Sequence, residues 1–376
     1  MANPTTYRKF TMTIYFVLFT AVFLLGALGI PKVWAKDLGT PPRPLSRDVT
    51  STINGYFISL VFLSHLRSNI DKSAYASTDQ GYLSVIGFLG QLVVATFLFY
   101  SGYGIMESIT RKGQRYIYEL PRKRILPYLL DVCLAIAVFL VTRTAIGKDP
   151  VSLETLLLSL IGWKSIGNSN WYIFAILCLW LFTYLSFRIF PRKNQRWCAT
   201  LLVFMFTAVY YCLMVREGID HWWYDTVFCY PCGMTLSLAK DAIHARRVAV
   251  PHSFPARAAG AALLLALFLF LHEHAYESWV IFNVCAVVFA LFISLCSTFF
   301  KYLSKPFLWA GDNLFYLYIY QRIPMMVLAP YLASNAFLFT TACLITLIPL
   351  VYLMKWLDAR WKGFLLASPP EGNEGL

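Results

Sequence analysis

The feature that most constrains this chain is a series of long apolar segments separated by short polar loops. The first, residues 10–30, has 21 residues without a charged side chain, enough for one helix to cross a bilayer. Within a bilayer each segment has to satisfy its own backbone polar groups, so the pattern predicts an all-α polytopic membrane protein with about eleven spans. The ten further apolar segments begin near Thr52, Tyr82, Ile125, Trp171, Cys198, Trp222, Ala258, Ser278, Leu308 and Phe337.

Composition and charge placement agree with this class. Charged residues make up 14% of the chain and the mean hydropathy is +0.60, whereas soluble domains carry about 25% charge. The net charge of +13 by itself would allow a nucleic-acid partner. However, 23 of the 32 Lys and Arg residues lie in alternate loops, which is the positive-inside pattern of membrane topology. We therefore expect a multi-pass protein of a bacterial-type inner membrane, with a cytoplasmic C-terminus, the lipid bilayer as a partner and no nucleic acid.

Two apolar segments leave more than one interpretation. Residues 10–30 could be a cleaved signal peptide, since residues 33–35 loosely resemble a cleavage site, but the length of the segment favours a retained helix. Residues 153–163 are too short to span and predict an interfacial or re-entrant helix. The expected organisation is an extra N-terminal helix (1–35), a Pro-rich connector (36–51), a membrane core (52–357) and a cytoplasmic tail (358–376).

Two polar residues stand out in the second span, NGYFISLVFLSH. Asn54 and His65 are eleven residues apart, so on a helix they share a face and lie about 16 Å apart along the axis. An ionisable side chain inside a membrane is costly and indicates a functional site. The alternative is a structural histidine that is hydrogen-bonded between helices.

A second candidate region follows the third span. In FLFYSGYGIMES, the small residues Ser101, Gly102 and Gly104 permit the close approach of a helix or a ligand. Six cations then occur between Arg111 and Arg124. Such a cluster suits a phosphate-bearing ligand, although anionic lipid headgroups are the other interpretation.

Four stretches together resemble acyltransferase family 3, the integral-membrane acyltransferases of glycans. They are NGYFISLVFLSH, FLFYSGYGIMES with RKRILPYL, NSNWYIFAILCLWL and GDNLFYLYIYQRIPM. The likeness covers about residues 50–355 and ten spans, with the first helix as an addition. The chain departs from the family pattern twice, since Asn54 stands where the family has a basic residue and Gln321 where it has a histidine.

The resemblance implies transfer of an acyl group, usually acetyl, from cytoplasmic acyl-CoA to a hydroxyl of an outward-facing polysaccharide or glycolipid. It implies acyl-CoA as a co-substrate and no permanently bound cofactor or metal. His65 would be the catalytic residue, as general base or as acyl carrier. The donor side would involve Asn54, Ser101, Tyr103, Arg122, Lys123 and Arg124, and the acceptor side Trp171, Gln321 and Arg322.

Two other classes of membrane protein compete with this interpretation. A transporter or flippase of a lipid-linked sugar or acyl group would be expected to show repeated halves, and we find no convincing internal repeat. A glycan polymerase or ligase would be expected to carry a large outer loop with several arginines, whereas the predicted outer loops are short. The His-bearing second span, followed by the SGYG and RKR segments, favours an acyltransferase.

Overall fold

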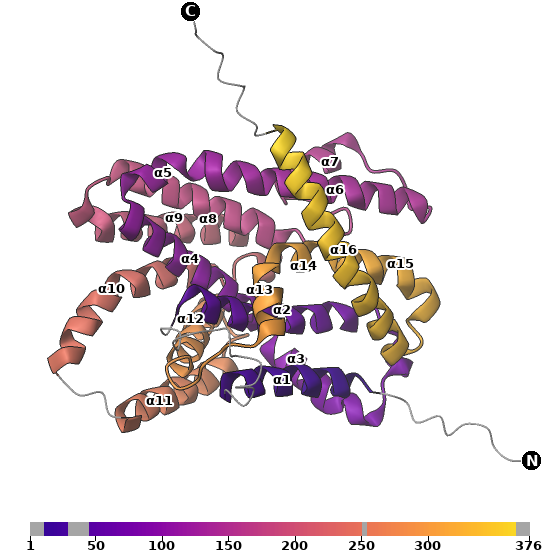
Figure 1. Ribbon diagram of the computed structural model, residues 1–376, viewed down its shortest axis with the longest axis horizontal. Helices are drawn as coiled ribbons and strands as arrows, with labels where there is room; N and C mark the ends of the chain where they lie inside the picture. The colour runs from indigo at the N-terminus through magenta and orange to yellow at the C-terminus, as the bar shows by residue number, and fades with distance from the viewer. Residues whose placement is uncertain (1–10, 29–44, 250–253, 366–376) are drawn as a thin grey trace, which may run out of the picture.

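The computed structural model describes residues 11–28, 45–249 and 254–365. Within these ranges the chain forms helices and no strands (Figure 1), which confirms the all-α class. Eight helical stretches are long and apolar enough to cross a membrane, so the polytopic character is also confirmed. Their helices are α2 (Arg47–Arg67), α4 (Leu92–Lys112), α6 (Leu126–Ala145), α8 (Trp171–Ile189), α9 (Arg196–Arg216), α11 (Phe254–Glu273), α12 (Trp279–Cys296) and α16 (Ala336–Leu365).

The remaining predicted spans are also helical, but their helices are shorter, interrupted or begin later than predicted. The first is α1 (Met12–Leu28), and the predicted span at Trp222 begins later, as α10 (Cys229–Ala249). The segment from Leu308 is divided into α13 (Lys305–Asp312), α14 (Leu314–Tyr320) and α15 (Arg322–Leu332). A short helix, α3 (Gln80–Leu89), precedes α4, because Gly90 adopts a positive φ of 46° that ends the helix. The short helix predicted at residues 153–163 is α7 (Leu153–Leu160).

Parts of the predicted organisation lie outside the described residues. These are residues 1–10 and 29–35 around the first helix, residues 36–44 of the connector and residues 366–376 of the tail.

Segments that the basic residues assign to the same side of the membrane meet in space. Arg196, at the start of α9, donates from Nη1 to Thr110 Oγ1 near the end of α4 at 3.4 Å. At the opposite ends of the helices, the Asp71 N–H donates to the Ala333 carbonyl at 3.0 Å. The predicted alternation of loops between the two sides of the membrane is therefore consistent with the packing. The assignment of one side as cytoplasmic stays a prediction.

Helix α1 is part of the bundle and runs antiparallel to α2. Near its start, the Thr13 N–H donates to Asp79 Oδ1 at 3.0 Å, in the segment that follows α2. Near its end, the Ala27 carbonyl accepts from the Lys301 N–H at 3.0 Å. These contacts fix both ends of the additional helix against the segments that carry the rest of the fold.

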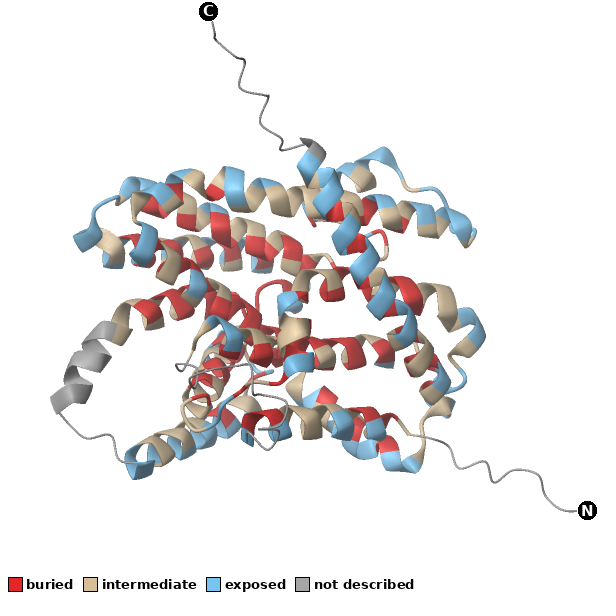
Figure 2. Cartoon of the chain, viewed as in Figure 1, coloured by how far each residue is buried: buried red, intermediate tan, exposed pale blue. Residues whose placement is uncertain are grey.

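The most buried helices, α2 and α4, lie in the middle of the molecule, whereas α11 is largely exposed (Figure 2). Both central helices make very close backbone crossings. A Cβ at Gly311 of α13 would lie 1.8 Å from the Ser51 carbonyl oxygen of α2, and one at Gly102 of α4 would lie 1.9 Å from the Tyr230 carbonyl oxygen of α10. Only glycine permits such approaches, and these crossings fix the helices that carry Asn54 and Ser101.

Candidate active site

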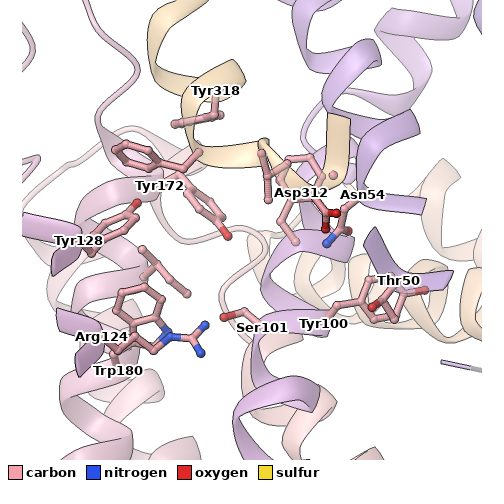
Figure 3. Close-up of a pocket in the computed structure, with 15 residues that line it drawn as sticks. Thr50, Asn54, Tyr100, Ser101, Arg124, Tyr128, Tyr172, Trp180, Asp312 and Tyr318 are labelled. Carbon is pink, nitrogen blue, oxygen red and sulfur yellow. The ribbon is translucent and has the colours of Figure 1, made fainter. Parts of the chain in front are cut away.

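A cavity of about 300 Å³ opens at the Asn54 end of α2 and is here called the first cavity. It lies among α2, α4, α6, α8 and the α13–α14 segment (Figure 3). Three of the residues predicted for the donor side line it together, namely Asn54, Ser101 and Arg124. They come from parts of the sequence up to 70 residues apart, so only the fold brings them together.

Arg124 is the cation that faces this cavity. Its guanidinium lies 4.6 Å from the centroid of the Trp180 ring, and its Nη1 donates to the Tyr116 hydroxyl at 3.3 Å. Such stacking holds a guanidinium in place. The two neighbouring cations, Arg122 and Lys123, are exposed and do not line the cavity, and Lys123 Nζ contacts Glu119 Oε2 at 2.9 Å.

The local backbone explains why the three cations separate. Residues Pro121–Ile125 form a π-helical turn between α5 (Gln114–Leu120) and α6, a feature that often accompanies functional sites. Consecutive residues of any helical turn point in different directions around the axis. One side chain of the basic run therefore faces inward while the other two face outward.

Asn54 and Ser101 supply the polar groups of the opposite wall. Asn54 Oδ1 is buried and has no hydrogen-bond partner among the described residues. Figure 3 shows Asn54 beside Asp312, and the Ser101 hydroxyl directed toward the Arg124 guanidinium. Tyr103 does not line this cavity. It is two residues, or about 200°, further around α4, where its backbone nitrogen lies beside Gly233 of α10.

Aromatic rings form much of the remaining wall. The ring centroids of Tyr172 and Tyr318 lie 5.4 Å apart, and those of Tyr128 and Trp180 lie 5.1 Å apart, and all four residues line the cavity. Residue type alone does not distinguish them among the 23 tyrosines and 11 tryptophans of the chain. A weak signal existed for Tyr128 alone, since it follows Arg124 by four residues and so shares its helix face.

His65 lies eleven residues further along α2 than Asn54. Its ring Nδ1 is buried and has no hydrogen-bond partner among the described residues. A structural histidine would use its ring nitrogens to join helices. Nδ1 of His65 makes no such bond to a described residue.

A larger cavity, of about 790 Å³, lies at the His65 end of α2 and is here called the second cavity. It is lined by Asn69, just beyond α2, by Lys148 and Gly167, and by residues of α15 that include Arg322. Helix α2 therefore runs from the first cavity toward the second: Asn54 lines the first, Asn69 just beyond the helix lines the second, and His65 lies between them in sequence and lines neither.

Arg322 is oriented by the loop that precedes α8. Its Nε donates to Ser169 Oγ at 2.9 Å. The same loop is fixed internally, since Asn168 Oδ1 accepts from the Ile166 N–H at 3.1 Å and Asn170 Nδ2 donates to the Gly162 carbonyl at 3.1 Å. Sequence reasoning missed Ser169, because the NSNW segment was noted for its tryptophan rather than for its polar residues.

Trp171 and Gln321 line neither of these cavities. Trp171 is buried and packs edge-on against Tyr172, with ring centroids 5.8 Å apart. Gln321 is buried as well, and its Nε2 donates to the Tyr318 carbonyl at 3.0 Å. It faces a separate apolar cavity of about 350 Å³ among α1, α2, α13, α14 and α16.

The part of the chain that the structure describes contains no group of three or more His, Cys, Asp and Glu residues arranged to hold a metal ion. The chemistry that the described site offers is therefore that of an imidazole, a guanidinium, an amide and hydroxyls.

Comparison with known proteins agrees with the sequence motifs. The model of acyltransferase family 3, described as an acyltransferase domain, matches residues 53–356. Because this match covers most of the chain, the protein belongs to the acyltransferase-3 family, which confirms the resemblance. No curated protein and no solved structure matches the chain.

Proposed function

We propose that this protein transfers an acyl group, in the first instance acetyl, from cytoplasmic acyl-CoA to a hydroxyl of a cell-surface polysaccharide or glycolipid. The observation that carries the proposal is the position of His65. It lies on the helix that runs from the first cavity toward the second, and it has a buried ring nitrogen without a partner among the described residues, although the ring lines neither cavity. The family membership supports acyl transfer as the reaction class.

The first cavity is the proposed donor site. It lies at the end of α2 where the basic loops gather, which the positive-inside rule assigns to the cytoplasm. Its volume of about 300 Å³ is at the low end of the range for ligand pockets. It therefore suits the acyl group and the adjoining part of the donor. The phosphates of CoA would remain outside, near the exposed cations Arg122 and Lys123.

His65 has two possible roles in the transfer. As a general base it would take the proton of the acceptor hydroxyl, whose oxygen attacks the thioester carbonyl and expels the CoA thiolate. As an acyl carrier, its nitrogen would attack the thioester carbonyl and expel the CoA thiolate. The acceptor hydroxyl would then attack the acyl-imidazole and expel the imidazole, which takes up the hydroxyl proton. Both routes need an imidazole nitrogen with a free lone pair.

Reconstitution tests the proposal directly. The purified chain would be inserted into proteoliposomes and supplied with labelled acetyl-CoA on one side and extracted surface glycan on the other. Label in the glycan, located by mass spectrometry as an ester, supports the proposal. The proposal would be contradicted if acetyl-CoA saturated its site on the protein but no acetyl group reached any hydroxyl-bearing glycan or glycolipid.

Arg124→Ala is expected to raise the KM for acyl-CoA by about 10-fold, which corresponds to the loss of one interaction with a charged group. The KM for the acceptor should change little, because Arg124 lines only the first cavity. The measurement is a donor titration in proteoliposomes. Lys193→Ala is the matched control, since that side chain is an exposed cation of another basic loop and does not line the cavity. Equal effects of the two substitutions would argue against a donor site in the first cavity.

Asn54→Arg, which restores the charge that the family pattern has there, is expected to retain activity. An arginine at this position would share the Asp312 carboxylate of the same cavity with Arg47, whose Nη2 lies 3.0 Å from Asp312 Oδ1, so its charge would be partly compensated. Initial rates at saturating and limiting acyl-CoA check this expectation, with Asn54→Leu as the comparison that removes the polar group. Complete loss of activity in Asn54→Arg would show that this wall no longer serves the donor as in the family.

A further inference from the structure

The second cavity contains a guanidinium that lacks an acidic partner. Arg322 is only half exposed, and within the described residues it forms no ion pair; its one hydrogen bond runs from Nε to Ser169. A partly buried charge without a counter-charge is costly. Its retention in a cavity points to a ligand that supplies the missing negative charge.

The surroundings of this guanidinium are electropositive. Lys148 lines the same cavity and is exposed, and none of the described residues that line it is acidic. Two carboxylates, Asp71 and Asp149, occur nearby in the sequence, but both are exposed and neither forms an ion pair with Arg322 or Lys148 among the described residues. The cavity is therefore complementary to an anion rather than to a neutral sugar.

A second arginine at the same end of the molecule shows the contrast. Arg143 donates from Nη1 to the Ile166 carbonyl at 3.4 Å and from Nη2 to the Asp149 carbonyl at 3.0 Å. Its terminal nitrogens are used to hold the loops of this region. In Arg322, the hydrogen bond to Ser169 uses only Nε, so the two terminal nitrogens are left for a ligand. Two adjacent guanidinium nitrogens match the oxygens of a carboxylate or a phosphate.

We infer that the acceptor carries an anionic group, a carboxylate or a phosphate, which Arg322 binds in the second cavity close to the hydroxyl that is acylated. This inference rests on the proposed function, because it identifies the second cavity as the acceptor side. It narrows the acceptor to an acidic glycan or a phosphate-bearing glycan.

The test is binding of defined probes to the full chain in lipid nanodiscs, without donor. The probes are a uronic-acid oligosaccharide, its neutral methyl ester, and a sugar phosphate. The wild-type protein should bind at least one anionic probe about 10- to 100-fold more tightly than the neutral ester, as expected for hydrogen bonds to a charged group. Preference between the two anionic probes then distinguishes carboxylate from phosphate. Equal binding of charged and neutral probes would overturn the inference.

Substitutions test whether the preference for anionic probes arises in the second cavity. Arg322→Gln should remove most of the preference for the anion and Arg322→Lys should keep part of it. Lys148→Gln, at an exposed position where folding is not at risk, should reduce it by a few-fold. Arg67→Gln is the matched control, because Arg67 is an exposed cation at the same end of α2 that does not line the cavity. Undiminished anion binding in both Arg322→Gln and Lys148→Gln would contradict the inference.

Two further outcomes separate this inference from the proposed function. If anion binding depends on Arg322 but no acyl transfer is found, the anion site stands and the reaction proposed above is wrong. If acyl transfer is found but Arg322→Gln lowers kcat and leaves probe binding unchanged, Arg322 acts on the transition state and the inference of an anionic acceptor fails.

Discussion

His65→Ala is expected to reduce acyl transfer by about 10²- to 10⁴-fold, the range for removal of a general acid–base residue, and further if the ring carries the acyl group. The amount of protein in the membrane should stay close to that of the wild type. The reason is that the ring makes no hydrogen bond to another described residue through its buried Nδ1, so its removal leaves no polar partner unsatisfied.

Activity of proteoliposomes, normalised to protein measured by immunoblot or in-gel fluorescence, checks this expectation. His65→Gln should be as inactive as His65→Ala, because an amide is polar but cannot exchange a proton near neutral pH. His274→Gln is the matched control, since that histidine is exposed and pairs only with Glu277 at 2.9 Å among the described residues. Full activity of His65→Ala would remove the basis for the proposed mechanism.

The overall helical architecture could be predicted from the sequence, because the length of each apolar segment is visible along the chain without knowledge of tertiary contacts. Within the described residues, every predicted apolar segment contains a helix, and the motif order located the family. Helix interruptions were not accessible in the same way. The segment from Leu308 was predicted as one span, yet it is divided after Asp312 and after Tyr320. Both breaks fall at polar pairs, Asp312–Asn313 and Gln321–Arg322, and the close crossing at Gly311 lies beside the first break.

The candidate site was predictable in part, and the limit is geometric. Residue type and spacing identified Asn54 and His65, since both lie on one helix. The run Arg122–Arg124 could not be resolved into one inward cation and two outward ones, because the π-helical turn that separates them is not encoded in a hydropathy pattern. Ser169 was missed for a similar reason, since its role depends on a contact with Arg322, 153 residues away.

The two cavities on α2 also have a consequence for how the reaction could be arranged. The path from Asn54 to His65 is about 16 Å along the helix, roughly half of a hydrocarbon core. A donor in the first cavity and an acceptor in the second would thus approach the same histidine from opposite ends of α2. This arrangement requires α2 to be held rigidly. The close crossing of α2 with α13 at Gly311 would hold it in place, as the crossing at Gly102 holds α4 against α10.

Gly102→Ala is expected to destabilise the protein by about 3 kcal/mol or more, at or above the upper end of the usual cost of overpacking. The added Cβ would lie 1.9 Å from the Tyr230 carbonyl oxygen, and backbone rather than a flexible side chain would have to move. Since α4 carries Ser101 and α10 is its close neighbour, the expected result is loss of folded protein from detergent extracts, measured by size-exclusion chromatography and thermal unfolding.

Gly104→Ala provides the matched control within the same SGYG segment. A Cβ at Gly104 meets no atom within 4 Å among the described residues, and alanine has the higher helix propensity, by about 1 kcal/mol. This variant should therefore be as stable as the wild type or slightly more so. If both alanine variants were equally stable, the close crossing of α4 and α10 would be wrong. Helix packing predicts that alanine destabilises the protein at Gly102 but not at Gly104. If both variants lost folded protein equally, the SGYG segment would have to be required for a ligand rather than for helix packing.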